Sequence, residues 1–232
     1  MDEARGLADR LESVNQRIRA AAARSGRSAE SVRLLAVTKG FPAKTVRQAM
    51  ALGLREFAEN RVQEAEKKIA AVEPRPRWHL VGHLQSNKVR RAVQVFDAIH
   101  SIDTIPLARE VSRRAVDAGK PIPCLVEVNT SGEASKFGIE PESALALVRE
   151  TRACEGIVLA GLMTIGPLSG GSDAARGAFR LLAQIRERGR DQGLLTESAE
   201  LSMGMSDDYE IAIEEGATTV RIGTGIFGGR PA

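Results

Sequence analysis

Aromatic side chains are scarce in this chain, and so is net charge. Only 3% of the 232 residues are aromatic, and 33 basic residues stand against 30 acidic ones. Proteins that bind single strands of nucleic acid stack bases on aromatic rings, and proteins that bind duplexes present a concentrated positive field. We therefore expect no nucleic-acid partner, and we interpret the basic face of segment 86–96 as solvated surface.

Cysteines and long apolar runs are also few. Cys124 and Cys154 form no CxxC pair, and the first ten residues are charged where a secretory leader would be apolar. The longest apolar run, residues 157–163, is far shorter than the ~18 residues that a membrane span needs. We expect a cytoplasmic protein in a reducing compartment, without a membrane partner.

The chain does contain a regular alternation of short apolar runs with helical patterns. Residues 2–24 have apolar side chains at helical spacing, and Ser25-Gly26 ends that helix. Helical patterns also fill the gaps between eight strand candidates, at residues 33–38, 56–59, 78–81, 97–100, 122–129, 157–164, 199–202 and 219–223.

Eight strands separated by crossovers predict a parallel sheet, and about 25 residues per unit is typical of the (β/α)8 TIM-like barrel. An open doubly wound sheet would give the same alternation, but no glycine-rich dinucleotide turn follows the first strand. We therefore predict an α/β fold with one domain over residues 1–232, an extra N-terminal helix within 1–26 and the barrel within 33–228.

The first predicted strand ends at Lys39. Functional residues of a barrel gather at the C-terminal ends of its strands. Because side chains alternate along a strand, Lys39 shares a face with Leu35 and Val37, and an inward Leu35 would put the lysine at the barrel mouth. A partly desolvated lysine loses affinity for its proton and becomes a Schiff-base nucleophile, whereas an exposed lysine is ordinary surface.

Two glycine-rich turns follow the seventh and eighth predicted strands. Residues 202–207 read SMGMSD, with a helix expected from Asp207, and residues 223–228 read GTGIFG. These two loops are the usual phosphate site of a barrel, because glycine lets backbone N–H groups approach the oxygens. Ser202 and Thr224 add hydroxyl groups. The glycines could simply make tight turns, but together they predict a phosphorylated ligand facing Lys39.

Other polar positions leave alternatives open. Arg221, inside a core strand, is either in a structural ion pair or aimed at the ligand, because an unpaired buried charge is costly. Asn60 either contacts a bound ring or caps the helix expected from Arg61. His79 and His83 resemble a metal-ligand pair, but no Cys, His or Asp partner accompanies them at metal spacing, so we expect no metal.

Seven segments, in this order, carry a resemblance to one family. They are LLAVTKGFP (34–42), FAENRVQEA (57–65), WHLVGHLQSNK (78–88), VNTSGEASKFG (128–138), GLMTI (161–165), LSMGMSDDYEIAIEEGAT (201–218) and VRIGTGIFG (220–228). On these segments, the protein is identified as a member of the pyridoxal phosphate homeostasis proteins, single-domain relatives of the alanine racemase N-terminal barrel, and the resemblance spans essentially the whole chain.

The resemblance implies that pyridoxal 5′-phosphate (PLP) is the cofactor and that Lys39 holds it as a Schiff base. It implies that Arg221 faces the pyridine nitrogen and that Asn60 lies beside the ring. The residues implied around the phosphate are Ser202, Gly223 and Thr224.

Two positions depart from the family pattern. Ala58 stands where glycine is common, and Gly40-Phe41 stands where threonine is frequent after the lysine. These departures affect the shape of the cofactor mouth and leave the lysine in place.

The resemblance also implies a PLP carrier without classical amino-acid turnover. An arginine, which is strongly basic and keeps its proton, would leave the pyridine nitrogen unprotonated and the ring a poor electron sink. Related racemases take a second base, a tyrosine, from a separate C-terminal domain, whereas this chain ends soon after strand eight and its only tyrosine is Tyr209. We expect a monomer that exchanges PLP with apo PLP-dependent enzymes and free amino acids.

Two enzymatic alternatives stay open. A PLP-dependent amino-acid racemase or related enzyme predicts turnover of alanine or serine. A class I aldolase acting on a sugar phosphate shares the lysine and the phosphate cup, and it predicts no visible chromophore. The small residues and Lys136 of segment 131–136 predict a mobile lid.

Overall fold

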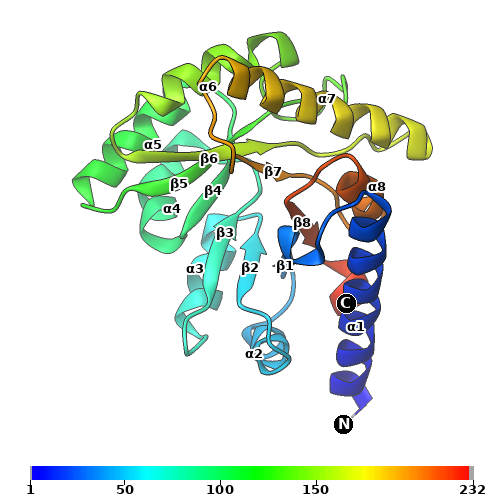
Figure 1. Ribbon diagram of the computed structural model, residues 1–232. Helices are drawn as coiled ribbons and strands as arrows, with labels where there is room; N and C mark the ends of the chain where they lie inside the picture. Colours follow the sequence, from blue (N-terminus) through cyan, green and yellow to red (C-terminus); the bar gives the residue numbers. More distant parts are fainter. Residues whose placement is uncertain (1, 230–232) are drawn as a thin grey trace.

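The computed structural model describes residues 2–229, whose eight strands form a closed parallel barrel (Figure 1). The strands are β1 (Arg33–Val37), β2 (Glu56–Glu59), β3 (Arg77–Leu80), β4 (Ala98–Ile102), β5 (Ile122–Glu127), β6 (Ile157–Met163), β7 (Glu200–Ser202) and β8 (Thr219–Ile222). Each strand pairs with the next, and β8 pairs back with β1. The barrel prediction is confirmed, and the open sheet is excluded by this closure.

Helices surround the barrel on its outer side. They are α1 (Asp2–Arg24), α2 (Ala43–Ala51), α3 (Val62–Ala70), α4 (Val89–Val95), α5 (Ile105–Asp117), α6 (Ala144–Arg152), α7 (Gly171–Asp191), α8 (Tyr209–Glu214) and α9 (Thr224–Phe227). Within the described residues, no helix is long and apolar enough to cross a bilayer. The two ends of the expected domain, residue 1 and residues 230–232, lie outside the part of the chain that the structure describes.

Two expected helix starts are wrong by one or two residues. Helix α8 begins at Tyr209 instead of Asp207, because the Asp208 carboxylate accepts a hydrogen bond from the Met205 N–H at 2.6 Å and closes a turn before the helix. Helix α3 begins at Val62, because Arg61 has an extended backbone with φ −132° and ψ 126°.

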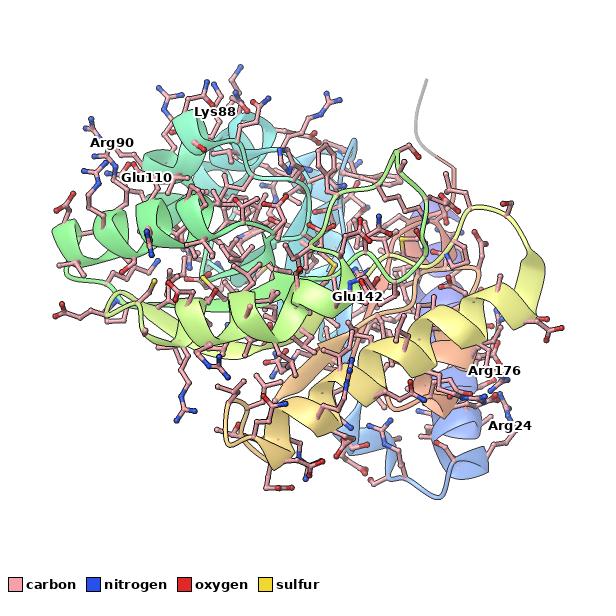
Figure 2. The ribbon with its side chains drawn as sticks, turned by 90° about the horizontal axis from the view of Figure 1, so that it is seen from above. Arg24, Lys88, Arg90, Glu110, Glu142 and Arg176 are labelled. Carbon is pink, nitrogen blue, oxygen red and sulfur yellow. The ribbon has the colours of Figure 1, made fainter. Side chains whose placement is uncertain are left out.

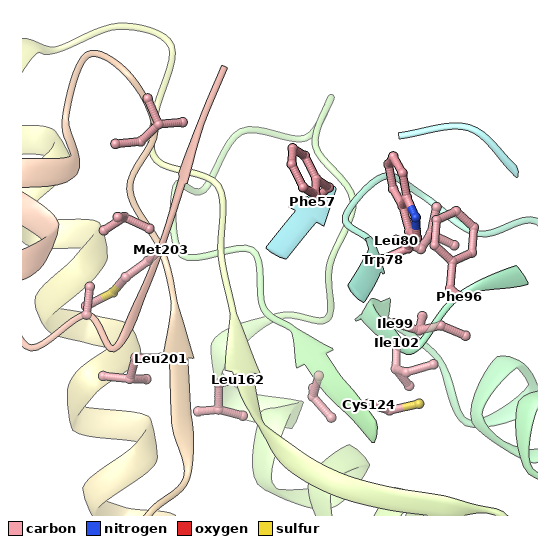
Figure 3. Close-up of a cluster of buried hydrophobic side chains, with 14 of the residues drawn as sticks. Phe57, Trp78, Leu80, Phe96, Ile99, Ile102, Cys124, Leu162, Leu201 and Met203 are labelled. Atoms are coloured by element: carbon pink, nitrogen blue, oxygen red, sulfur yellow. The ribbon is translucent and has the colours of Figure 1, made fainter. Parts of the chain in front are cut away.

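The outward faces of the strands pack under the helices and form the main hydrophobic core (Figure 3). Fully burying such a side chain stabilises the fold by roughly 1.5–3 kcal/mol. The residues labelled there include Phe57, Trp78, Leu80, Phe96 and Leu162. A smaller apolar cluster lies apart from this core and consists of Leu35, Val37, Ala58 and Val81.

The two clusters fix which way the side chains of β1 point. Leu35 and Val37 belong to the small inner cluster, whereas Ala36 belongs to the outer core. Strand β1 ends at Val37, two residues before the expected end at Lys39, so Lys39 lies in the turn that follows the strand at the C-terminal end of the barrel.

Helix α1 packs on elements from the end of the chain, beside α8 and α9 (Figure 1). Arg24 forms ion pairs with Glu210 and Glu214, and Arg176 of α7 shares Glu214. Figure 2 shows Arg24 and Arg176 close together at one edge of the molecule. Exposed pairs contribute about 0–1 kcal/mol each, so their main effect is to fix how α1 sits against α7 and α8.

Gly161 of β6 has a position that only glycine fits. Its φ is 154°, and a Cβ there would lie 2.2 Å from the Glu200 carbonyl oxygen of β7. The ladder with β5 shifts register at the same point, next to Leu125.

Gly161→Ala is expected to lower the free energy of unfolding by about 3 kcal/mol or more, because the added methyl must displace the backbone of β7. Urea unfolding followed by circular dichroism measures the loss. Gly177→Ala is the matched control, since a Cβ there meets no atom within 4 Å in helix α7, and it should gain up to about 1 kcal/mol. Equal stability of the two variants would contradict this account.

Candidate functional site

The C-terminal ends of β1 and β8 lie side by side at the barrel mouth. Leu35 pairs with Arg221 and Ala36 pairs with Ile222. The next residue, Gly223, is close enough that a Cβ on it would lie 3.2 Å from the Val37 carbonyl oxygen. Because the half-buried Lys39 follows two residues after Val37, this register puts the lysine beside the turn that begins at Gly223.

The turns after β7 and β8 are joined to each other. The Gly225 N–H donates to the Ser206 hydroxyl at 3.1 Å, and the Arg221 N–H donates to the Gly204 carbonyl at 3.0 Å. Gly204 has φ 89°, and a Cβ there would lie 2.6 Å from the Ala212 side chain. The two glycine-rich turns therefore form one continuous surface. Ser206 is a polar residue of this surface that the sequence reasoning did not single out.

A buried ion pair holds the residue before Lys39. The Lys68 ammonium donates to the Thr38 carbonyl at 2.6 Å and to Glu59 Oε1 at 2.5 Å. The Thr38 hydroxyl donates to the same Glu59 oxygen at 2.6 Å. Burial raises the pKa of Glu59, and the hydrogen bonds from Lys68 and Thr38 oppose that rise.

A second carboxylate holds the residue after Lys39. Glu64 accepts a hydrogen bond from the Gly40 N–H at 2.6 Å and one from Lys68 at 3.3 Å. Burial alone would raise the pKa of Glu64, but these hydrogen bonds keep it below the ordinary value. The backbone is thus pinned on both sides of Lys39.

The sequence reasoning missed these three ionic residues, although a signal was present. Glu59 shares the outward face of β2 with Phe57, under helix α3. A carboxylate on that face must be paired, and Lys68 is the cation that the helix supplies.

Arg221 is buried inside the barrel, with 4% of its surface exposed. Its Nη1 donates to the Ser202 carbonyl at 2.6 Å and to the Ser202 hydroxyl at 2.8 Å, and its Nη2 donates to the Thr164 carbonyl at 2.8 Å. Burial lowers the pKa of Arg221 to about 10, and Glu127 and Asp208 oppose the shift. Among the ion pairs of residues 2–229, none involves Arg221, so the expected alternative of a direct ion pair is wrong.

Ser202 is fully buried, and its hydroxyl is committed to the barrel interior. It contacts Arg221 and lies 3.0 Å from His100 Nδ1. Thr224 opens the short helix α9, directly after Gly223. The polar groups at the surface of the joined turns therefore come from Ser206 and Thr224 more than from Ser202.

Asn60 does not cap helix α3. The residue at the cap position is Arg61, and no side chain hydrogen-bonds there. Asn60 Oδ1 is instead buried without a hydrogen-bond partner. Buried polar atoms are nearly always paired, so an orphan carboxamide oxygen marks a place for a ligand donor or a water. The capping alternative is wrong.

Asn60 lines a hollow of about 410 Å³ at the mouth, together with Gly82, His83 and Phe137. The rings of His83 and Phe137 stack at 3.8 Å. Phe137 belongs to the loop after β5, whose Lys136 donates to the Gly166 carbonyl. The loop that contains the predicted lid, residues 131–136, thus reaches across this side of the mouth.

His79 and His83 have separate partners. His79 contacts Glu56 and His100, whereas His83 contacts Asp103 at 3.3 Å. Over the described range, the structure brings together no group of three or more residues able to hold a metal ion.

Glu127 is a buried carboxylate at the end of β5, with 3% of its surface exposed and Oε2 without a partner. Burial and the neighbouring Asp103 raise the pKa of Glu127 to about 7, and Arg221 opposes the rise. The barrel mouth therefore holds a carboxyl group that titrates near neutrality, which the sequence reasoning did not find.

The chain matches the family model described as the alanine racemase N-terminal domain over residues 10–231. It is 43% identical to the pyridoxal phosphate homeostasis protein of Pseudomonas aeruginosa over 97% of this chain and 96% of the relative. It is 39% identical to the human protein of the same name, over 97% of this chain and 87% of that one.

Solved structures agree with the fold. PipY of Synechococcus elongatus, solved with PLP bound, has a TM-score of 0.82 at 37% identity, and the match covers 96% of this chain and all of PipY. An alanine racemase of Clostridium difficile has a TM-score of 0.77 at 13% identity, and the match covers 100% of this chain and 61% of the racemase.

Lys68→Met is expected to lower the free energy of unfolding by about 3–5 kcal/mol, because it leaves the Glu59 carboxylate buried without a cation. The double variant Lys68→Met/Glu59→Gln should recover most of that loss. Urea denaturation of both variants measures the coupling. If Lys68→Met unfolds like the wild type, the ion pair does not stabilise the site.

Glu127→Gln is expected to be more stable than the wild type at pH 8, by up to about 3 kcal/mol. The folded protein binds the Glu127 proton more tightly than the unfolded chain does, because the folded pKa is raised to about 7. Stability from this group is present at low pH and is lost as pH rises toward 7. Urea unfolding at pH 4, 6 and 8 checks the sign, since the two proteins should agree at pH 4 and diverge above it.

Proposed function

The chain belongs to the pyridoxal phosphate homeostasis proteins, within the alanine racemase N-terminal domain family, and from this we propose that it binds PLP and exchanges it with other proteins and amines. The register between β1 and β8 supports this proposal most strongly. It brings the backbone of Lys39 beside the turn that begins at Gly223, and we propose that one aldehyde-bearing phosphate ester reaches both the lysine and the joined turns.

The polar groups at the mouth fit this cofactor. Asn60 has a buried oxygen without a partner, and Arg221 is a buried cation. A Cβ at Gly223 would press on Val37, so a glycine there keeps the backbone open for a phosphate oxygen. The cation and the backbone cradle suit the anionic groups of the ligand, and the Asn60 oxygen leaves a place for a hydrogen-bond donor or a water beside its ring.

We assign each residue one role. The Lys39 amine would hold PLP through its aldehyde, by a bond that another amine can replace. Gly223, Thr224 and Ser206 hold the phosphate through N–H and hydroxyl groups. Ser202 supports the site indirectly, because its carbonyl and hydroxyl oxygens accept hydrogen bonds from Arg221.

Arg221 would hold PLP by donating a hydrogen bond to its pyridine nitrogen, and Asn60 would contact its ring. Bound PLP supplies an electron sink for amino-acid chemistry, and it does so best when its pyridine nitrogen is protonated. The pKa of Arg221, lowered by burial to about 10, still leaves the guanidinium charged at neutral pH, where it donates a hydrogen bond without giving up its proton. This favours a carrier over an enzyme.

The chain's tyrosine supports the same reading. Tyr209 is 1% exposed, and the Arg17 guanidinium of α1 lies 5.2 Å from its ring centroid. It belongs to the outer core, so it is not a second base at the mouth. We therefore propose a non-catalytic PLP carrier, monomeric and cytoplasmic, that supplies apo PLP-dependent enzymes and reacts with free amino acids.

Lys39→Ala is expected to abolish the visible absorption band that PLP gives when it is bound through a lysine, and borohydride should no longer fix PLP to the protein. Lys44→Ala is the matched control, because Lys44 is exposed in helix α2 and should leave the band unchanged. The near-ultraviolet and visible absorption spectrum measures both variants.

Three outcomes would contradict the proposed function. A band that survives in Lys39→Ala assigns the anchor elsewhere. Steady turnover of alanine or serine by the wild type favours the racemase alternative. A colourless wild type that borohydride traps only in the presence of a sugar phosphate favours the aldolase.

A further inference from the structure

A continuous line of hydrogen bonds crosses the barrel interior and ends at Arg221. Glu56 Oε2 lies 2.6 Å from His79 Nε2, and His79 Nδ1 lies 2.9 Å from His100 Nε2. His100 Nδ1 lies 3.0 Å from the Ser202 hydroxyl, which in turn lies 2.8 Å from Arg221 Nη1. Five residues from five strands are therefore linked without a gap.

The line is buried along almost its whole length. His79, His100, Ser202 and Arg221 are each at most 4% exposed. Glu56 is the first residue of β2, at the N-terminal end of the barrel, and 25% of its side chain is exposed. One end of the line therefore meets the surface opposite the mouth, and the other end lies under the joined turns.

Donors and acceptors along the line follow from the protonation of its end groups and from the fact that a neutral imidazole carries one N–H. Burial alone would raise the pKa of Glu56, but His79, Arg33 and Arg77 keep it below the ordinary value, so its carboxylate accepts. The Nε2 of His79 must then carry a hydrogen, which leaves its Nδ1 bare when the ring is neutral.

The same logic continues through the second ring. His100 is fully buried, and burial together with His79 and Arg221 lowers its pKa well below the ordinary value, so it is neutral. Its Nε2 donates to His79, and its bare Nδ1 accepts from the Ser202 hydroxyl. The Ser202 oxygen is then free to accept from Arg221, which can only donate.

We propose that Glu56, His79 and His100 are positioning residues for Arg221, joined in a one-way hydrogen-bond relay in which every donor points from the guanidinium toward the Glu56 carboxylate. The relay commits the Ser202 O–H to His100 Nδ1, so that the Ser202 oxygen accepts from Arg221, and this sets the plane of the guanidinium at the mouth. It also links the buried Arg221 cation, through hydrogen bonds that all point the same way, to the Glu56 carboxylate. Its role toward PLP rests on the proposed function.

Other charges act on both ends of the relay without belonging to it. Arg33 and Arg77 lie near Glu56, and Glu127 and Asp208 act on Arg221. Glu200 lies at the same N-terminal end of the barrel, but it is bonded to Arg33 and Thr219. Glu200 therefore offers a matched control for Glu56.

The hydrogen positions can be measured without cofactor. Nitrogen-15 NMR of histidine-labelled apo protein at pH 8, where imidazoles are generally neutral, should show His79 and His100 both protonated on Nε2 and bare on Nδ1. Ser202→Ala should remove the preference at His100. An Nδ1-protonated form at either ring in the wild type would overturn the relay, whether or not PLP binds.

The positioning role is measured by PLP affinity. Glu56→Gln keeps the shape but removes the terminal charge, and its dissociation constant for PLP should rise about three- to tenfold. Glu200→Gln should stay within a factor of two of the wild type, on the order of measurement error. Equal constants for the two variants would overturn the role of Glu56. A wild type that does not bind PLP contradicts the proposed function, and the NMR result then decides the relay alone.

Discussion

Closure of the sheet between its first and last strands is the constraint on which the site depends. The pairing of Ala36 with Ile222 joins residues that are far apart in sequence and brings the Lys39 backbone beside Gly223. A one-residue slip in a parallel ladder would turn every side chain of β1 to the other face. Such a slip would be costly, because it would take Leu35 and Val37 out of the inner cluster and Ala36 out of the outer core. The apolar packing of β1 therefore fixes the register that brings Lys39 to the barrel mouth.

The barrel interior is divided between a small apolar cluster and a set of polar groups. The apolar cluster lies on β1, β2 and the residue after β3, whereas His100, Glu127, Ser202 and Arg221 come from β4, β5, β7 and β8. Burying polar groups is costly unless they bond one another. Hydrogen bonds among His100, Ser202 and Arg221 satisfy these buried groups. The buried oxygens Asn60 Oδ1 and Glu127 Oε2 have no hydrogen-bond partner.

The sequence pattern predicts the barrel well, because eight short apolar runs of strand length alternate with segments whose apolar residues recur at helical spacing. It does not predict how buried charges pair. The pairing of Glu59 with Lys68 depends on the rotation of α3 over β2, and the contact of Ser202 with Arg221 depends on the stagger of β7 against β8. Asn60 shows the same limit, since a capping residue and a ligand contact look alike in sequence until the helix start is known.

The contact of α1 with α8 and α9 has a consequence for the order of assembly. Helices α8 and α9, and the strand β8 that closes the sheet, all lie between residues 209 and 227. Domains generally fold as units during synthesis, and non-local pairing is slow. A chain in which residues 209–227 are not yet synthesised therefore cannot close the sheet, and it lacks both of the helices α8 and α9 on which α1 packs.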